Sequence, residues 1–140
     1  CEMAVSLGWS VHLWDERIHD TQLKDYGENI VVDNGKRDPN KDYSIIRSVS
    51  GIILKSHNMS IDAFWLSQIE PYHQHIRYIG LLGPNYRKEK VIEQALLTES
   101  TWAEKSVFSP AGLDIGGDTP ESIALSILSQ AHIHLSSSPE

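Results

Sequence analysis

The apolar residues of this chain fall into short continuous runs and into longer stretches with a helical period. Residues 51–56 and 77–83 contain continuous apolar runs that are too short for helices. Such runs are typical of strands that are covered on both faces of a parallel sheet. Residues 9–14 alternate and are rich in aromatic side chains, which predicts another strand, and two more strands are predicted at residues 28–33 and 107–110.

Helices are predicted between these strands, where apolar residues recur every three to four positions. The expected helical segments are residues 1–7, 43–48, 60–74, 84–98 and 119–135. Ser60 is a suitable N-cap for the third segment, and Ile123, Ile127 and Ala131 share the expected buried face of the last. Strands that alternate with helices predict an α/β domain with a mostly parallel sheet and right-handed crossovers.

The composition narrows the class of protein. At 140 residues, with 40% apolar and 22% charged residues, the chain is typical of one soluble globular domain. The single cysteine, Cys1, excludes an intramolecular disulfide and indicates a reducing, cytoplasmic compartment. The formal charge of −7 argues against non-specific nucleic-acid binding. No apolar run approaches the roughly 18 residues of a membrane span, and no histidine or cysteine cluster has the spacing of metal ligands.

The loops after the strands are the first places to examine for chemistry, because α/β domains bind ligands outside the carboxyl ends of their strands. Asp15 ends the first predicted strand, where an acidic residue can bond ribose hydroxyls, although an exposed aspartate is also common there. His57 and Asn58 follow the strand at residues 51–56 and can donate hydrogen bonds to a ligand, or transfer a proton. Alternatively, Asn58 forms an Asx-type turn and His57 caps a loop.

A second loop joins the strand at residues 77–83 to the next helix. The Gly83-Pro84 junction between strand and helix would aim free backbone amides at a ligand there. Three cations occupy the first turns of the helix, namely Arg87, Lys88 and Lys90. Cations near a helix N-terminus are electrostatically unfavourable, so their presence favours a bound anion such as phosphate. Alternatively, they form a solvated basic face that pairs with glutamates of the same helix.

The stretch "GLDIGGDTPES" precedes the last predicted helix. Thr119 is a good N-cap, and Glu121 is favourable to the helix dipole. Alternatively, the preceding aspartate caps the helix and Glu121 completes a capping box. Capping does not explain Gly112 and Gly116, which bracket Asp114 where the backbone needs a positive φ or a close approach. This part of the stretch is therefore a candidate binding loop, with Asp114 as its main polar contact.

Two long motifs, "YIGLLGPNYRKEKVI" and "SPAGLDIGGDTPESIALSIL", together resemble the C-terminal domain of the xanthine dehydrogenase accessory family (XdhC/CoxI type). The segments "GIILKSHNMSID" and "AVSLGWSVHLWDER" extend the resemblance over essentially the whole chain. The resemblance implies a Rossmann-like fold of three layers with a mostly parallel sheet. The positions that match the motifs of the family are His57, Asn58, Gly80, Gly83, Pro84, Arg87, Gly112, Asp114, Gly116, Thr119 and Glu121.

The resemblance also implies an accessory protein or chaperone, rather than an enzyme, for a molybdenum hydroxylase of the xanthine dehydrogenase type. Such a protein binds the molybdopterin cofactor, protects it during sulfuration and delivers it to the apo-enzyme, so a sulfurase is a further expected partner. Molybdopterin carries a phosphate, which suits Gly83 and Arg87, and a pterin, which Asp114 can recognise.

Two alternatives stay open at this point. One is an NAD(P)-dependent oxidoreductase or nucleotide-binding domain in which Asp15 bonds the ribose. The other is a structural or nucleotide-sensing domain that pairs with itself, since the aromatic residues leave room for a homodimer.

The chain begins within a helical pattern that has no capping residue, so residues 1–140 are interpreted as one N-terminally truncated domain. In the family that it resembles, a glycine-rich loop precedes this helix, and a separate N-terminal domain often carries cysteine motifs. In a Rossmann strand order, the missing first strand lies between the strands at residues 9–14 and 51–56. We therefore expect the first strand and the glycine-rich loop to belong to a longer parent protein.

Overall fold

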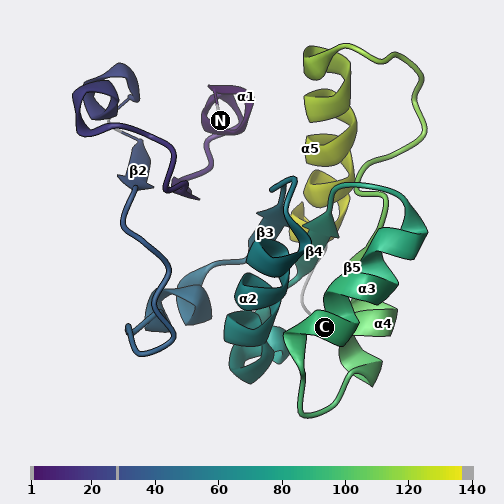
Figure 1. Cartoon of the computed structure of the whole chain (residues 1–140). Coiled ribbons are helices and arrows are strands. Elements are labelled where there is room, and N and C mark those ends of the chain that lie inside the picture. Colours follow the sequence, from purple (N-terminus) through teal and green to yellow (C-terminus); the bar gives the residue numbers. More distant parts are fainter. Residues whose placement is uncertain (1, 28, 137–140) are drawn as a thin grey trace. The chain divides into compact units, whose positions relative to one another are not determined.

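The computed structural model describes residues 2–27 and 29–136, in which strands and helices alternate (Figure 1). The strands are β1 (Val11–Trp14), β2 (Ile30–Asp33), β3 (Gly51–Leu54), β4 (Tyr78–Leu81) and β5 (Val107–Phe108). The α-helices are α1 (Glu2–Ser6), α2 (Met59–Ile69), α3 (Asn85–Ala95), α4 (Thr101–Ser106) and α5 (Pro120–Ser136). The described 3₁₀ helices are η1 (Asp20–Asp25), η2 (Ser44–Ser48) and η3 (Glu70–His75).

The chain divides into two compact units, Cys1–Asp42 and Tyr43–Glu140, and each has a parallel sheet of its own. In the first unit, β1 pairs with β2, and Val11 lies opposite Ile30. Gly8 follows α1 with a φ of +84°, which is the left-handed backbone typical of a glycine at a helix C-terminus. The unit thus contains α1, a tight turn, two parallel strands and the 3₁₀ helix η1 between them.

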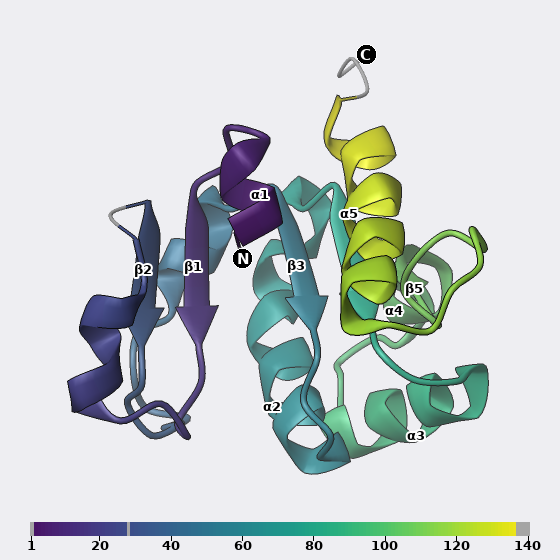
Figure 2. The ribbon, with the colours of Figure 1, turned by 90° about the horizontal axis from the view of Figure 1, so that it is seen from above.

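The second unit has the strand order β3-β4-β5, with Gly51 opposite Tyr78 and Ile79 opposite Val107. Helix α5 lies on one face of this sheet, and α2 and α3 lie on the other (Figures 1 and 2). Parallel strands with helices on both faces confirm the predicted Rossmann-like α/β fold.

Within each unit, neighbouring strands follow one another in the chain. Among the described residues, β1 pairs only with β2, and β3 pairs only with β4. The additional strand that we expect between β1 and β3 stays a prediction, as does the interpretation of residues 1–140 as one domain. Cys1, which opens the first predicted helix, and Glu28, which opens the second predicted strand, lie outside the described residues.

The core of the second unit is built around β4, whose four residues are all buried. Because β4 pairs on both edges and is covered on both faces, it needs apolar side chains at every position. The residues that form the core are Tyr43, Ile46, Leu54, Ala63, Leu66, Ile69, Ile79, Leu81, Val91, Ile92, Ala95, Ala103 and Val107. The strands β3, β4 and β5 pack on this one core, which positions their carboxyl ends relative to one another.

Three details of the helices differ from the prediction. Helix α3 ends earlier than expected, because Leu96 adopts a left-handed backbone with a φ of 50°. Helix α4 was not predicted; its six residues bury only Ala103 completely, which leaves too little periodic pattern to recognise. In α5, Ile127 and Ala131 are buried as predicted, whereas Ile123 is exposed.

Replacing Leu96 by glycine is expected to raise the free energy of unfolding by about 1 kcal/mol. A left-handed backbone costs a residue with a Cβ roughly 1–2 kcal/mol, and the Leu96 side chain is 87% exposed, so little burial is lost. Urea unfolding of the variant and the parent protein measures the difference. Glu93→Gly, in the exposed interior of the same helix, is the control and should lower stability by about 1 kcal/mol. A loss of stability in both variants would contradict the prediction.

Candidate functional site

The loops after β3, β4 and β5 meet at one edge of the second unit, which we call the carboxyl edge. The amide of Leu82 donates to the carbonyl of Leu54 at 3.0 Å, and the amide of Ala111 donates to the carbonyl of Leu81 at 3.0 Å. Ser109 Oγ donates to the carbonyl of Gly83 at 3.1 Å. These bonds bring together three loops that lie far apart in the sequence. They are the three loops in which His57, Gly83 and Gly112 were predicted to form a site.

Asn58 is the N-cap of α2, which corrects the expectation for Ser60. Its Oδ1 accepts hydrogen bonds from the amides of Ser60, at 2.8 Å, and Ile61, at 3.3 Å. This confirms the alternative in which Asn58 makes an Asx-type turn. His57 is exposed, and the structure gives its side chain no hydrogen bond within the described residues. His57 is thus available to a ligand, while the oxygen of Asn58 serves the helix.

The side chain of Arg87 is largely buried among the loops of the carboxyl edge and does not face solvent. Its guanidinium bonds Asp62 Oδ2 at 2.7 Å and the carbonyls of Leu82 and Ser56, each at 3.0 Å. The side chain of Arg87 is 13% exposed and that of Asp62 is 1% exposed. Three protein acceptors therefore explain the position of Arg87 without a bound anion, and its contact with a phosphate stays a prediction.

The other two cations of α3 have partners in the protein as well. Lys88 Nζ donates to the carbonyls of Glu104, at 2.8 Å, and Val107, at 2.7 Å, near the end of α4. The pKa of Lys88 lies below its usual value, because burial lowers it and the nearby charge of Glu104 offsets only part of that effect. Lys90 Nζ lies 5.9 Å from the centre of the Tyr86 ring. Hydrogen bonds to backbone carbonyls thus explain why Arg87 and Lys88 lie near the start of the helix. Their presence there no longer requires a bound anion.

The candidate binding loop begins with a glycine that is packed against α5. Gly112 has a φ of +112°, and a Cβ on it would overlap with Ser126 Oγ. The amide of Gly112 donates to Gln130 Oε1 at 2.8 Å, and the amide of Leu113 donates to the carbonyl of Ser126 at 3.1 Å. The start of the loop is therefore fixed by α5.

The rest of this loop is exposed. Gly116 and Gly117 have φ values of +82° and +85°, and a Cβ on Gly116 would meet no atom within 4 Å. Asp114 is exposed, and its side chain has no described hydrogen bond. Thr119 Oγ1 accepts a hydrogen bond from the amide of Ser122 at 3.1 Å, which confirms Thr119 as the N-cap of α5. The loop thus presents backbone and two carboxylates, Asp114 and Asp118, beside a well-capped helix.

Gly80 and Tyr78 form a packing pair within β4. A Cβ on Gly80 would lie 2.7 Å from the phenol oxygen of Tyr78, so Gly80 makes room for that ring. The phenol donates to Gln130 Oε1 at 2.6 Å, the atom that also accepts from Gly112. Tyr78 is buried, and burial raises its pKa to about 12. Gly80 therefore supports the binding loop through Tyr78 and Gln130 and lies within a buried strand.

The raised pKa of Tyr78 predicts a loss of stability at alkaline pH. Below pH 10 the phenol is neutral in both states; between pH 10 and about 12 it ionises in the unfolded chain but stays protonated in the folded one. The stability that Tyr78 contributes is therefore complete below pH 10 and falls as the pH rises towards 12. Denaturant unfolding of wild type and Tyr78→Phe, from pH 8 to 12, should show a difference that shrinks above pH 10. Parallel curves would contradict the prediction.

Asp15 belongs to the first unit, where it ends β1 as predicted. Its carboxylate accepts hydrogen bonds from Arg17, through the backbone amide, Nε and NH2, each at 3.0 Å. The Arg17 side chain is 76% exposed, so this ion pair contributes little stability. The proposed bond to a ribose stays a prediction, and an arginine beside the acidic residue is a feature that the sequence analysis did not use.

The structure adds residues to the carboxyl edge that the sequence analysis did not select. These are Ser56, Asp62, Ser126 and Gln130. Only Asp62 carries a signal in the sequence, because it lies on the same helical face of α2 as the buried Leu66 and Ile69. A carboxylate at a core position needs a partner, and that partner is Arg87.

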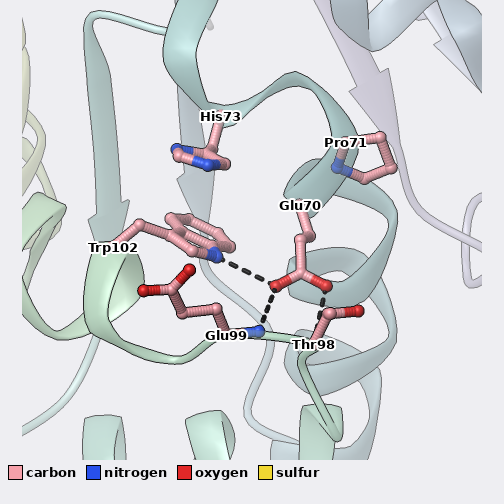
Figure 3. Close-up of a pocket in the computed structure, with 6 residues that line it drawn as sticks. All are labelled: Glu70, Pro71, His73, Thr98, Glu99 and Trp102. Atoms are coloured by element: carbon pink, nitrogen blue, oxygen red, sulfur yellow. Dashed lines mark hydrogen bonds between the residues drawn. The ribbon is translucent and has the colours of Figure 1, made fainter.

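A pocket of about 330 Å³ lies elsewhere in this unit, lined by Glu70, Pro71, His73, Thr98, Glu99 and Trp102 (Figure 3). The Glu70 carboxylate accepts from the amides of Thr98, at 2.9 Å, and Glu99, at 3.3 Å, and from Trp102 Nε1, at 3.0 Å. Burial alone would raise the pKa of Glu70, but these hydrogen bonds lower it. Because η3 and α4 lead into β4 and β5, the pocket lies towards the amino ends of the strands, away from the carboxyl edge.

Two general features limit what the described residues can do. Within residues 2–27 and 29–136, no group of three or more His, Cys, Asp or Glu side chains is arranged to hold a metal ion. In the same part of the chain, every helix is too short or too polar to cross a bilayer.

Comparisons with known proteins agree with this architecture. The sequence matches the XdhC Rossmann domain over residues 1–131, whereas a search of curated proteins finds no match. The fold is similar to that of a solved structure described as a xanthine dehydrogenase from Bacillus halodurans, with a TM-score of 0.62 and 22% sequence identity. The similarity covers 99% of this chain and 39% of that one, so the chain spans well under half the length of the solved protein. Since the family match extends over almost the whole sequence, the chain belongs to the family of XdhC Rossmann domains.

Proposed function

We propose that the chain is the cofactor-binding part of an accessory protein that matures a molybdenum hydroxylase of the xanthine dehydrogenase type. The observation that carries this proposal is the family match over residues 1–131. In this role the protein holds the molybdopterin cofactor during sulfuration and delivers it to the apo-enzyme in the cytoplasm. Its partners are then the apo-enzyme, a sulfurase and a second copy of itself, and the protein performs no turnover.

The chemistry of the carboxyl edge fits such a ligand. The amides of Asn85 and Tyr86 begin α3 after Pro84, which provides no side-chain cap, so they can donate hydrogen bonds to a phosphate, whereas the amide of Arg87 donates to the carbonyl of Pro84. Asp114 and His57 are exposed and can bond the polar edge of a pterin. Gly116 leaves open space above its backbone, which allows a flat ring to approach closely. When bound, the cofactor supplies the molybdenum chemistry of the target enzyme, and this chain contributes only binding and orientation.

Purification of the complete protein from cells that synthesise molybdopterin tests the proposal. Acid oxidation of the purified protein should release a fluorescent pterin in a near-stoichiometric amount. Asp114→Ala should lower the pterin content about tenfold, as expected for the loss of a charge-assisted hydrogen bond. Asp118→Ala removes a second exposed carboxylate from the same loop and is the matched control, which should leave the pterin content unchanged.

The second candidate is an NAD(P)-dependent oxidoreductase or nucleotide-binding domain. One observation favours it: Asp15 ends β1 and lies beside the exposed Arg17, as an acidic residue and an arginine do around the ribose of NAD or NADP. The same preparation distinguishes the two candidates. Saturable binding of NADH or NADPH, in protein that releases no pterin, would overturn the accessory function in favour of the oxidoreductase.

A further inference from the structure

We propose that Arg87 and Asp62 form a buried clamp that positions the loops of the carboxyl edge, and that Arg87 does not itself contact the ligand. The clamp rests on the geometry of the chain. Only its consequence for pterin binding rests on the proposed function. The clamp reassigns an arginine whose place beside a helix N-terminus first favoured a phosphate contact.

The clamp joins three elements through one guanidinium. Asp62 lies in the first turn of α2, Ser56 lies in the loop after β3, and Leu82 lies in the loop after β4. Arg87 NH1 bonds Asp62 Oδ2 at 2.7 Å and the carbonyl of Leu82 at 3.0 Å, and NH2 bonds the carbonyl of Ser56 at 3.0 Å. Because Ser56 directly precedes His57, the clamp fixes the backbone that carries this exposed side chain.

Three of the five N–H donors of Arg87 are bonded to protein acceptors, so an anion could draw the guanidinium out of the clamp only at the expense of these bonds. Asp62 is 1% exposed, so removing its cation would leave a buried carboxylate without a counter-charge. Such a change is strongly unfavourable, whereas a phosphate in water is well solvated. Bonds to two backbone carbonyls would be lost at the same time. The guanidinium therefore stays with its protein partners when a ligand binds.

Gly83 is part of the same device. Its φ is +102°, and a Cβ at this position would lie 2.7 Å from Arg87 Cδ, so the absence of a side chain lets the arginine stem pass. The carbonyl of Gly83 accepts a hydrogen bond from Ser109 Oγ at 3.1 Å, which links the loop after β5 to the clamp. The glycine and the arginine of "GPNYR" thus serve one purpose, which is to hold three loops in register.

Hydrogen exchange on the complete protein tests the clamp. Arg87→Lys keeps the charge beside Asp62 but loses the planar fork, and Asp62→Asn keeps the shape but loses the charge. Both variants should speed exchange of the amides of Asn58 and Leu82 about tenfold or more, as expected when an anchoring hydrogen bond is lost. Exchange in α5 should stay unchanged. Lys105→Met, which removes an exposed cation from α4, is the matched control and should alter none of these amides.

A titration with inorganic phosphate provides the second readout. We expect the NMR resonance of the Arg87 Nε–H group to stay in place as phosphate is added. In a separate measurement, both clamp variants should lose pterin to the same extent. A shift of that resonance with phosphate, together with unchanged exchange of Asn58 and Leu82 in Asp62→Asn, would overturn the clamp. If wild-type protein holds no pterin, the proposed function fails, while the exchange rates still decide whether the clamp exists.

Discussion

Gly112→Ala should lower the free energy of unfolding by about 2–6 kcal/mol, measured by urea unfolding of the complete protein. Two effects contribute. The φ of +112° is unfavourable for any residue with a Cβ, which costs about 1–3 kcal/mol. The new Cβ would overlap with Ser126 Oγ and lie 3.4 Å from the backbone nitrogen of Ile127, and such overpacking costs about 1–3 kcal/mol more.

Two further variants separate these effects. Gly116→Ala meets the same kind of backbone penalty in open space, because a Cβ there has no neighbour within 4 Å, so its loss should be only about 1–3 kcal/mol. Ser126→Ala removes the overlapping oxygen and should recover part of the stability of Gly112→Ala, but none of that of Gly116→Ala. Equal losses at the two glycines, with no recovery, would show that packing against α5 is not what requires Gly112.

This contrast changes the interpretation of the glycine-rich loop. Its glycines looked equivalent in the sequence, where each could provide either a positive φ or a close approach. In the structure, Gly112 anchors the loop to α5, whereas Gly116 and Gly117 shape an exposed turn beside Asp114. Only the exposed half of the loop is available for a ligand, so substitutions there report on binding with a smaller effect on the fold.

The sequence predicted the strands of the fold well, because continuous apolar runs in β3 and β4 have a single physical cause. A strand buried on both faces needs apolar side chains at every position, and few other structures of that length do. Helix α4 could not be predicted in the same way. It is short, and its stability comes from tertiary contacts such as Lys88 Nζ with the carbonyl of Glu104 rather than from a pattern of its own.

The site was predicted less completely, because a sequence shows which groups are present but not which of them are already satisfied. Arg87 and Lys88 lie in the first turns of α3 as expected, yet their carbonyl partners come from other elements and leave no local signal. Gln130 was missed for the same reason: it lies on α5 but bonds Tyr78 of β4 and the amide of Gly112. The exposed loop positions of His57 and Asp114 were easier to anticipate, since they need no distant partner, and their contact with a ligand stays a prediction.

Asp62→Leu should lower the free energy of unfolding by about 3–5 kcal/mol, again measured by urea unfolding. The substitution places an apolar side chain of suitable size on the buried face of α2. It also leaves the guanidinium of Arg87 largely buried without its counter-charge. Breaking a buried ion pair from one side has this magnitude, because the remaining charge keeps its desolvation penalty and loses the attraction that offset it.

The double variant Asp62→Leu/Arg87→Met should be more stable than Asp62→Leu alone, since it removes the unpaired charge and fills the space with apolar atoms. It should not regain the full stability of the wild type. The carbonyls of Ser56 and Leu82 would both lose a donor, at about 1 kcal/mol each. A double-mutant cycle with Arg87→Met should therefore give a coupling energy of about 2 kcal/mol or more between the two side chains. Additive losses would mean that the pair is not coupled, and that Asp62 is buried for a reason other than Arg87.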